Sequence, residues 1–358
     1  MIEERLNKVL KIMENSSVPQ MIVSDPAAIY YLTGKWILSG ERMLALYISL
    51  KGDNKLFINE LFPVKEDLGV KKIWFNDTQS PVEILAKYVI KDKPMGIDKN
   101  WPAHFLIKLM ELNGGSKFVN GSEILDRVRM CKDEVEKDLM RIASALNDKA
   151  VDKMIKLIPK KYPEKKMGKL LGDIWEDMGA QGHSFDPIIG YGANAADPHH
   201  EIDESTVKEG DSVVIDIGCK MNSYCSDMTR TVFYKTVSDH SREVYNIVKE
   251  ANKRGIEKVK AGVRFCDIDA AARDYITEKG YGKYFTHRLG HSIGIEVHDF
   301  GDVSASNTDK VQIGQIFSIE PGIYIPGDVG VRIEDLVIVT QDGCEVLNHY
   351  TKDLIIVK

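Results

Sequence analysis

Hydrophobic positions along the first 125 residues switch between helical and extended spacing. The apolar residues between Leu6 and Met13 recur every three or four positions, which predicts an amphipathic helix near the start of the chain. Short runs of aliphatic and β-branched residues, broken by glycine and proline, predict strands in the same region. These strands are predicted at residues 21–25, 43–50, 55–60 and 93–102. The alternation indicates an α/β domain over residues 1–125.

A long helical pattern marks a change in the chain near residue 125. Asp133 is followed three residues later by Glu136, the arrangement of a helix capping box. Beyond residue 180, β-branched runs and glycine turns predominate, so we expect a second α/β (α+β) domain over residues 126–358. The apolar stripe after the capping box predicts that this domain opens with a helix of about five turns. Its buried face is predicted to contain Leu139, Ile142, Ala143 and Leu146.

Composition fits an ordinary globular protein of two domains. The chain has 358 residues, of which 43% are hydrophobic and 28% charged. The net charge of −6 gives no reason to expect nucleic acid or an anionic membrane as a partner. No apolar stretch approaches the ~20 residues of a transmembrane helix, and the charged first segment does not resemble a secretion signal. Five cysteines without a CxxC pair favour free thiols and a cytoplasmic location.

Four acidic residues interrupt runs that otherwise have the pattern of buried strands. Asp216 lies in DSVVIDIG, Asp227 in SDMTRTVF, Glu320 at the end of GQIFSIE and Glu334 in GVRIEDLVIVT. An ionised carboxylate buried in a strand is costly unless it is paired or bound to a metal. For either aspartate alone, an ion pair with Arg230 or a position at a solvated strand end is an alternative. Four such carboxylates together would repel one another and be forced to protonate unless cations intervene.

A histidine-rich stretch supplies a further metal ligand. The segment HRLGHSIGIEVHD, residues 287–299, holds three of the nine histidines of the chain. Four carboxylates would balance two divalent cations, and we expect His291 as the fifth ligand. This oxygen-rich set favours Mn²⁺, with Co²⁺ or Zn²⁺ as alternatives. A pair of such metals can activate water and polarise a carbonyl, which indicates a hydrolase.

Two features of the same stretch bear on its geometry. His287 and His291 are four residues apart, as in the helical zinc motif HExxH, but no glutamate lies between them and the glycines disfavour a helix. In a regular strand His291 and His298 would point to opposite faces. Both can serve one site only if the chain bends at Gly294.

With these residues assembled, the chain resembles the pita-bread metallopeptidases of family M24, and within them the Xaa-Pro aminopeptidases and prolidases. Residues 287–299 resemble the proline-peptidase signature along their whole length. The stretches VVIDIGCKMNSYCSDMTRTVF, FSIEPGIYIPG and GVRIEDLVIVT resemble the other family blocks in the same order, and GYGANAADPHH resembles the block with a substrate-side histidine. The stretch from RLNKVLKIM to IYYLTG resembles a creatinase-type amino-terminal domain. The resemblance therefore implies a creatinase-like domain followed by a pita-bread catalytic domain.

The resemblance also implies which residues bind two metal ions. Asp216 would be a terminal ligand of one metal. Asp227 and Glu334 would bridge the two metals, and His291 and Glu320 would bind the second.

Further roles are implied around the scissile bond. His199 and His298 would stabilise the oxyanion, and Glu320 would shuttle the proton. Arg332 would hold a ligand carboxylate in place, and His287 would help to line the pocket.

The implied reaction is hydrolysis of the bond between an N-terminal residue and a following proline in short peptides. Prolidases need a cation for the carboxylate of a dipeptide, and the family commonly has an arginine where this chain has Asp302. This departure favours an aminopeptidase unless another loop or a partner subunit supplies the cation. A methionine-aminopeptidase-like enzyme and an inactive, creatinase-like binding protein are the alternatives. The resemblance further implies a homodimer built through the amino-terminal half.

Overall fold

The chain forms two compact units in the computed structural model, which describes residues 1–358. One unit comprises residues 1–129 and the other residues 130–358. The division falls near the end of α5 (Ser122–Met130), and the boundary proposed from the sequence lies inside the same helix. None of the helices combines the length and the apolar character needed to cross a bilayer.

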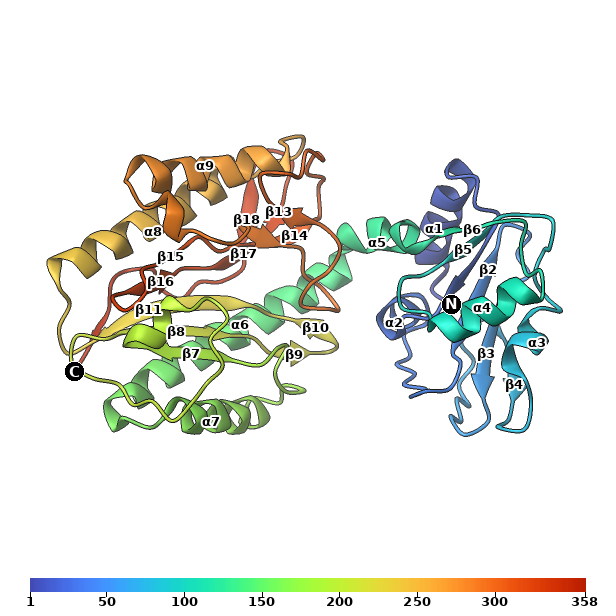
Figure 1. Cartoon of the computed structure of the whole chain (residues 1–358), viewed down its shortest axis with the longest axis horizontal. Helices are drawn as coiled ribbons and strands as arrows, with labels where there is room; N and C mark the ends of the chain where they lie inside the picture. Colours follow the sequence, from blue (N-terminus) through green and yellow to red (C-terminus); the bar gives the residue numbers. More distant parts are fainter. The chain divides into compact units, whose positions relative to one another are not determined.

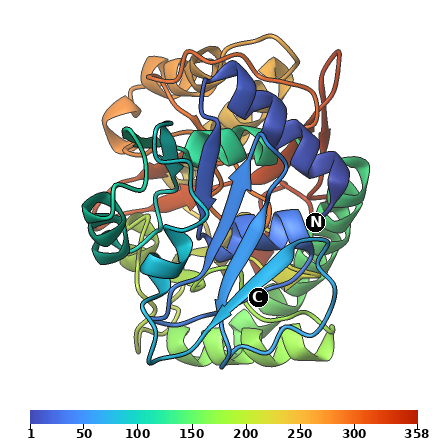
Figure 2. The same ribbon diagram turned by 90° about the vertical axis from the view of Figure 1, so that its right-hand side faces the viewer.

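A mixed six-stranded sheet organises the first unit. Its elements are α1 (Glu3–Asn15), β1 (Gln20–Val23), α2 (Pro26–Thr33), β2 (Ala45–Ser49), β3 (Lys55–Asn59), β4 (Lys71–Phe75), α3 (Pro81–Leu85), β5 (Met95–Ile97), α4 (Ala103–Glu111), β6 (Phe118–Asn120) and α5. The strand order is β4-β3-β2-β1-β5-β6, with β1 antiparallel to β2 and parallel to β5. Figure 2 shows the blue strands of this sheet side by side. The predicted helix and the four predicted strands are confirmed by α1, β1, β2, β3 and β5.

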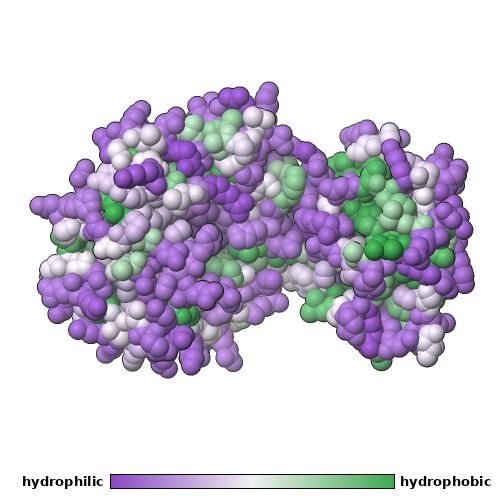
Figure 3. Space-filling model, in the orientation of Figure 1, coloured by the Kyte–Doolittle hydropathy of each residue, from purple (hydrophilic) through white to green (hydrophobic).

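The surface of the first unit carries most of the large hydrophobic side chains that are exposed. Seven of the eleven such residues in the chain belong to it. They are Ile2, Leu38, Leu50, Leu61, Trp74, Ile107 and Met110. Figure 3 shows hydrophobic residues gathered on this unit, within a face that is otherwise mostly hydrophilic. Exposed apolar patches often mark contacts with other proteins.

Two pairs of helices enclose the strands of the second unit. Its elements are α6 (Glu134–Leu157), α7 (Glu164–Asp177), β7 (Ile188–Tyr191), β8 (Ser212–Ile217), β9 (Lys220–Met221), β10 (Tyr224–Cys225), β11 (Met228–Tyr234), α8 (Asp239–Lys258), α9 (Phe265–Glu278), β12 (Gly290–His291), β13 (Asp302–Val303), β14 (Ile316–Ile319), β15 (Gly322–Tyr324), β16 (Gly330–Arg332), β17 (Asp335–Val339), β18 (Cys344–Val346) and β19 (Ile356–Val357). In Figure 1, α6 and α7 lie on one side of the strands, and α8 and α9 lie on the other.

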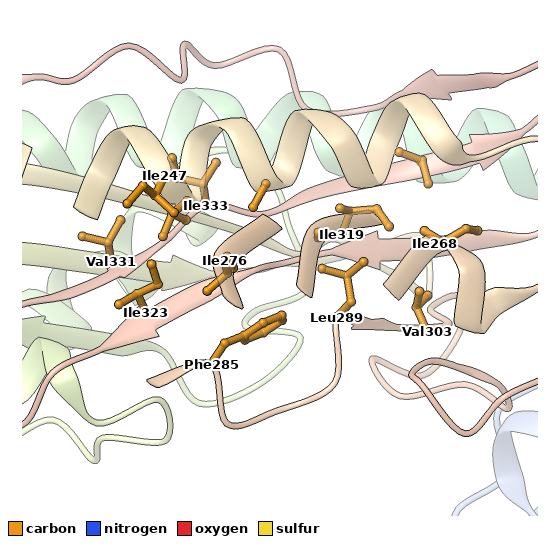
Figure 4. Close-up of a cluster of buried hydrophobic side chains, with 14 of the residues drawn as sticks. Ile247, Ile268, Ile276, Phe285, Leu289, Val303, Ile319, Ile323, Val331 and Ile333 are labelled. Atoms are coloured by element: carbon orange, nitrogen blue, oxygen red, sulfur yellow. The ribbon is translucent and has the colours of Figure 1, made fainter. Parts of the chain in front are cut away.

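A hydrophobic core lies beneath each pair of helices. Val151 of α6, Leu171 of α7 and Ile215 of β8 belong to one core. Ile247 of α8 and Ile319 of β14 belong to the other, which is shown in Figure 4. Every residue of β8 and β11 is buried. Burial on both faces explains why these strands have nearly continuous aliphatic runs, and why an acidic residue within them is conspicuous.

The helix α6 opens the second unit as predicted, but its buried face differs from the prediction. The capping box forms at its start, and the helix continues for 24 residues, which is longer than the predicted five turns or so. Of the predicted stripe only Ala143 is fully buried, and Ile142 is 46% exposed. The buried face includes Asn147, whose Nδ2 donates to the Ile217 carbonyl at 2.8 Å. A polar side chain is buried here because it bonds the neighbouring strand, which an apolar pattern alone does not reveal.

Candidate functional site

Two of the acidic residues lie on neighbouring strands. β8 and β11 pair in antiparallel register with Asp216 opposite Thr229, and they form the two arms of the predicted hairpin. Directly opposed residues project to the same face of a sheet, and Asp227, two positions before Thr229, shares that face. Both aspartates are buried, with 7% and 4% exposure.

The two glutamates lie at one end of a second strand pair. β14 and β17 are antiparallel with Ile319 opposite Asp335, so Glu320, just after β14, lies beside Glu334, just before β17. The strand predicted through Glu334 is interrupted there, between β16 and β17. The Glu334 N–H donates instead to the Thr229 carbonyl at 3.1 Å, and Thr229 Oγ1 donates to Glu334 Oε2 at 2.9 Å. Thr229 therefore joins the two strand pairs.

The histidine-rich segment bends so that two of its histidines meet. His291 ends the short strand β12, and the chain turns back from Gly294 to Asp299. The Asp299 N–H donates to the Ser292 carbonyl at 2.9 Å and closes the turn. The His298 ring then packs edge-on against the His291 ring, with 4.4 Å between their centroids. The bend that the sequence requires at Gly294 is present.

All nine residues predicted for the site line one cavity of about 840 Å³. His291 Nε2 lies 3.4 Å from Asp227 Oδ2 and 3.6 Å from Glu320 Oε1. Ligand atoms of Asp227, His291 and Glu334 lie within 4.8 Å of one another. The nine residues are Asp216, Asp227, His291, Glu320, Glu334, His199, His287, His298 and Arg332. Side chains from distant parts of the sequence thus converge on one space.

Burial and mutual repulsion disfavour the ionised carboxylates in this cavity. Desolvation, followed by the charge of Asp216, raises the pKa of Asp227 well above its usual value. Desolvation and then Asp227 raise the pKa of Glu334, and burial raises the pKa of Glu320 to about 7. One oxygen each of Asp216, Asp227 and Glu334 is buried without a hydrogen-bond partner. Cations would satisfy these oxygens and remove the repulsion, so the residues fit a divalent metal site.

An arginine fixes one of the carboxylates. Arg332 Nη2 donates to Asp216 Oδ2 at 2.6 Å, and its Nε donates to Thr229 Oγ1 at 3.0 Å. Arg230, the alternative partner considered for the aspartates, pairs with Asp335 at 2.7 Å. The alternative of an ion pair with Arg230 is therefore wrong.

His287 is hydrogen-bonded at both ring nitrogens. Its Nδ1 lies 2.7 Å from the Arg288 carbonyl, so Nδ1 is the donor, and its Nε2 lies 2.9 Å from the Tyr324 hydroxyl. Arg332 Nη1 donates to the same hydroxyl at 2.8 Å. Burial first, and then the charge of Arg332, lower the pKa of His287 to about 3. A neutral, fully bonded imidazole suits the wall of the cavity better than proton transfer.

The imidazoles of His199 and His298 make no hydrogen bonds within the protein. Partial burial first, and then the charge of His291, lower the pKa of His298 to about 4, so the ring is neutral near pH 7. His199 is exposed at the cavity, and only its backbone N–H is bonded, to Asp197 Oδ1 at 3.0 Å. Both rings are therefore available to a substrate oxygen.

Comparison with known proteins places this cavity in a family. Residues 138–341 match metallopeptidase family M24, and residues 5–131 match the creatinase/prolidase N-terminal domain. The chain belongs to metallopeptidase family M24. An uncharacterized peptidase of Staphylococcus haemolyticus (strain JCSC1435) is 34% identical over 355 residues, which cover 97% of this chain and 99% of the relative.

Solved structures similar to this M24 chain match it along nearly its whole length. The prolidase from Pyrococcus horikoshii OT3 has 31% identity and a TM-score of 0.90, and the match covers 98% of this chain and 100% of that one. The X-Pro aminopeptidase from Thermotoga maritima MSB8 has 30% identity and a TM-score of 0.84, with 97% and 100% covered. The predicted architecture, a creatinase-type domain followed by a pita-bread catalytic domain, is confirmed, and the chain is a metallopeptidase.

Several residues that shape the M24 cavity were not predicted from the sequence. Thr229 bonds both the Glu334 carboxylate and Arg332, and its position two residues after Asp227 was the available signal. Tyr324 connects His287 with an arginine, and Arg288 lines the cavity beside its neighbour in the signature. Their roles depend on partners from other strands, so the local pattern did not reveal them.

A second acidic cluster next to the M24 cavity is satisfied by hydrogen bonds. Glu164 Oε1 accepts from the Tyr191 N–H at 2.9 Å and from Asn194 Nδ2 at 3.0 Å. Glu164 Oε2 accepts from the Asp203 N–H at 3.0 Å and lies 2.6 Å from His200 Nε2. Because both oxygens of this buried carboxylate are fully engaged, the cluster orders the loop around it and differs from the carboxylates that lack partners.

Proposed function

We propose that the chain is an Xaa-Pro peptidase whose two divalent cations are held by Asp216, Asp227, His291, Glu320 and Glu334. The observation that carries the proposal is the convergence of four carboxylates and one imidazole in a cavity where three carboxylate oxygens lack hydrogen-bond partners. Similar solved structures include a prolidase and an X-Pro aminopeptidase, which supports this substrate class.

The ligand set favours Mn²⁺ as the native metal. Carboxylates and a single imidazole are the ligands that suit Mn²⁺ or Co²⁺, and Zn²⁺ is also compatible with them. When bound, two such ions would supply an activated water and polarise the scissile carbonyl. Arg332 would keep Asp216 oriented for binding through its 2.6 Å hydrogen bond.

The side chains around the cations would stabilise charge and transfer protons. His199 and His298, whose rings are not bonded within the protein, would donate hydrogen bonds to the developing oxyanion. Glu320 would take a proton from the attacking water and deliver it to the leaving nitrogen. His287 would keep its place in the cavity wall through its two hydrogen bonds.

An apolar part of the cavity wall suits a proline ring. Proline lacks an amide N–H, so a pocket shaped for its ring needs no hydrogen-bond acceptor at that atom. The free amino group of the substrate would lie near the acidic ligands, which restricts cleavage to N-termini. The apolar residues of the wall are Phe185, Pro187, Ile188, Pro198, Ile202 and Val297.

We also propose that the chain is a cytoplasmic homodimer that associates through its first unit. All five cysteines are free thiols, which supports a reducing compartment. The excess of exposed hydrophobic side chains on residues 1–129 supports the dimer.

Replacement of Glu320 by glutamine tests the proposed chemistry. Hydrolysis of an Xaa-Pro dipeptide should fall by about 10²-fold or more, because an amide cannot accept and return the proton. The matched control is Glu201→Gln, which changes an exposed carboxylate that also lines the cavity and should keep full activity.

Metal analysis completes the experiment. Protein purified without chelator should contain two divalent ions per chain. Full activity of metal-loaded E320Q would refute the proton transfer by Glu320. A parent protein that binds no divalent metal, or that prefers Met-Ala-Xaa to Xaa-Pro substrates, would refute the proposed function as a whole.

A further inference from the structure

A buried ion pair lies next to the turn that carries His298. Lys132 Nζ is 3.2 Å from Asp299 Oδ2, and the two side chains are only 1% and 4% exposed. Removing two charges from water costs more than their attraction commonly returns, so an ion pair buried this deeply is weak evidence for stability.

The pair fills the inside of the turn between Ser292 and Asp299. A side-chain carbon on Gly294 would lie 2.5 Å from Asp299 Oδ2 and 2.8 Å from Lys132 Cε. Only glycine leaves room for the lysine to reach the aspartate at this point. The bend at Gly294 and the ion pair therefore depend on each other, because the lysine side chain occupies the inside of the turn.

The other end of the lysine is fixed as well. The backbone N–H of Lys132 donates to the Gly314 carbonyl at 2.8 Å. Gly314 has a left-handed backbone with a φ of 84°. The Ile293 N–H donates to the Ile316 carbonyl at 3.2 Å, which attaches the start of the turn to β14. Lys132 therefore connects the strand that leads to Glu320 with the turn that leads to His298.

We propose that Lys132 is a positioning residue for His298. It holds Asp299, the next residue in the chain, and thereby fixes the His298 imidazole over the cavity in contact with His291. Neither Lys132 nor Asp299 lines the cavity, so the pair would act on the reaction through the position of the histidine and not by contact with the substrate. This inference rests on the proposed role of His298 in stabilising the oxyanion.

The variants Lys132→Met and Lys132→Met with Asp299→Asn test the inference in the metal-loaded full chain. We expect kcat for an Xaa-Pro dipeptide to fall by about 10²-fold, as misplacement of a catalytic group by about 1 Å can cause. KM and the metal content should remain within about twofold, because the variants replace neither a proposed metal ligand nor a residue that lines the cavity. If the single variant leaves an unpaired buried charge and fails to fold, the double variant, which removes both charges, decides.

Comparison with His298→Ala distinguishes positioning from a general structural role. In the His298→Ala background, Lys132→Met should cause no further loss of kcat, because the two changes remove the same interaction. The matched control is Lys137→Met, which removes a lysine that pairs with the exposed Glu134 and should leave kcat unchanged.

Three outcomes would overturn the inference, and the first two differ from failure of the proposed role of His298. If H298A loses activity while the folded Lys132 variants keep it, the inference is wrong and the proposed function stands. If the Lys132 change lowers kcat equally in the parent and in H298A, the lysine acts elsewhere and the inference is also wrong. If H298A itself is fully active, the proposed role of His298 fails and the inference fails with it.

Discussion

At the scale of single residues, Arg288 is the one unpaired cation that lines the cavity. The other cation in the wall, Arg332, is committed to Asp216 at 2.6 Å. Asp302, at the position where the family commonly has an arginine, lies in β13 opposite His291 and does not line the cavity. Arg288 is exposed, makes no ion pair, and its charge contributes to the low pKa of His298. It can therefore receive the carboxylate of a short peptide.

Replacement of Arg288 by alanine should distinguish dipeptides from longer substrates. For an Xaa-Pro dipeptide we expect KM to rise about tenfold, because a charge-assisted hydrogen bond contributes about 1.4 kcal/mol. Hydrolysis of Xaa-Pro-Xaa should change little, because its carboxylate lies one residue further from the scissile bond. Arg288→Lys serves as the control. Because lysine keeps the positive charge, this variant should retain part of the carboxylate binding and raise KM less than Arg288→Ala. Equal changes with both substrates would contradict a carboxylate-binding role.

At the scale of the elements, Asp335 at the start of β17 ties together three segments. It pairs with Arg230 of β11 at 2.7 Å and with Lys352 near the end of the chain at 2.6 Å. Burial alone would raise the pKa of Asp335, but Arg230 and Lys352 outweigh burial and lower it below the usual value. Because Glu334 directly precedes Asp335, these two ion pairs also fix the backbone next to Glu334, a proposed metal ligand.

Replacement of Asp335 by asparagine should therefore destabilise the protein in a pH-dependent way. Near neutral pH we expect a loss of about 3–5 kcal/mol, because Arg230 is left buried without its partner. A lowered pKa in the folded state means that the stabilisation is present above the pKa of the unfolded state, near 3.9, and is lost as the pH falls through the folded value. The difference in the free energy of unfolding between variant and parent, measured by urea denaturation, should narrow below about pH 4. A constant difference from pH 7 to pH 3 would contradict this account.

Local patterns in the sequence identified the elements that contain the candidate ligands, but not the contacts between those elements. Asp216 and Glu320 could be selected because each interrupts or ends an apolar run, a signal contained in a few neighbouring residues. The contact of Lys132 with Asp299 spans 167 positions, and that of Thr229 with Glu334 spans 105. The buried face of α6 was mispredicted for a related reason, because the burial of Asn147 depends on a carbonyl in another strand. Such pairings are set by the tertiary fold, and no window of sequence contains both partners.

At the scale of the whole molecule, the first unit offers the surface expected of an interface. The exposed residues Ile107 and Met110 lie on α4, and neither helps to form the core of the unit.

We expect sedimentation equilibrium to give twice the chain mass of 40.3 kDa. The double variant Ile107→Glu and Met110→Glu should shift the protein toward the monomer, because charged groups are costly to bury in an interface. Ile142→Glu, on the second unit, is the control and should not change the mass. A parent protein that sediments as a single chain would rule out the dimer.

The joining of two strand pairs through Thr229 has a consequence for the synthesis of the enzyme. The ribosome makes the hairpin of β8 and β11 first, and it makes the strands that flank Glu320 and Glu334 much later. A nascent chain that ends between them carries two aspartates without their glutamate counterparts, so an arriving ion meets only a partial set of ligands. If the proposed ligands hold the metal, loading would follow translation of both halves, and an unfinished chain would not hydrolyse the peptides around it.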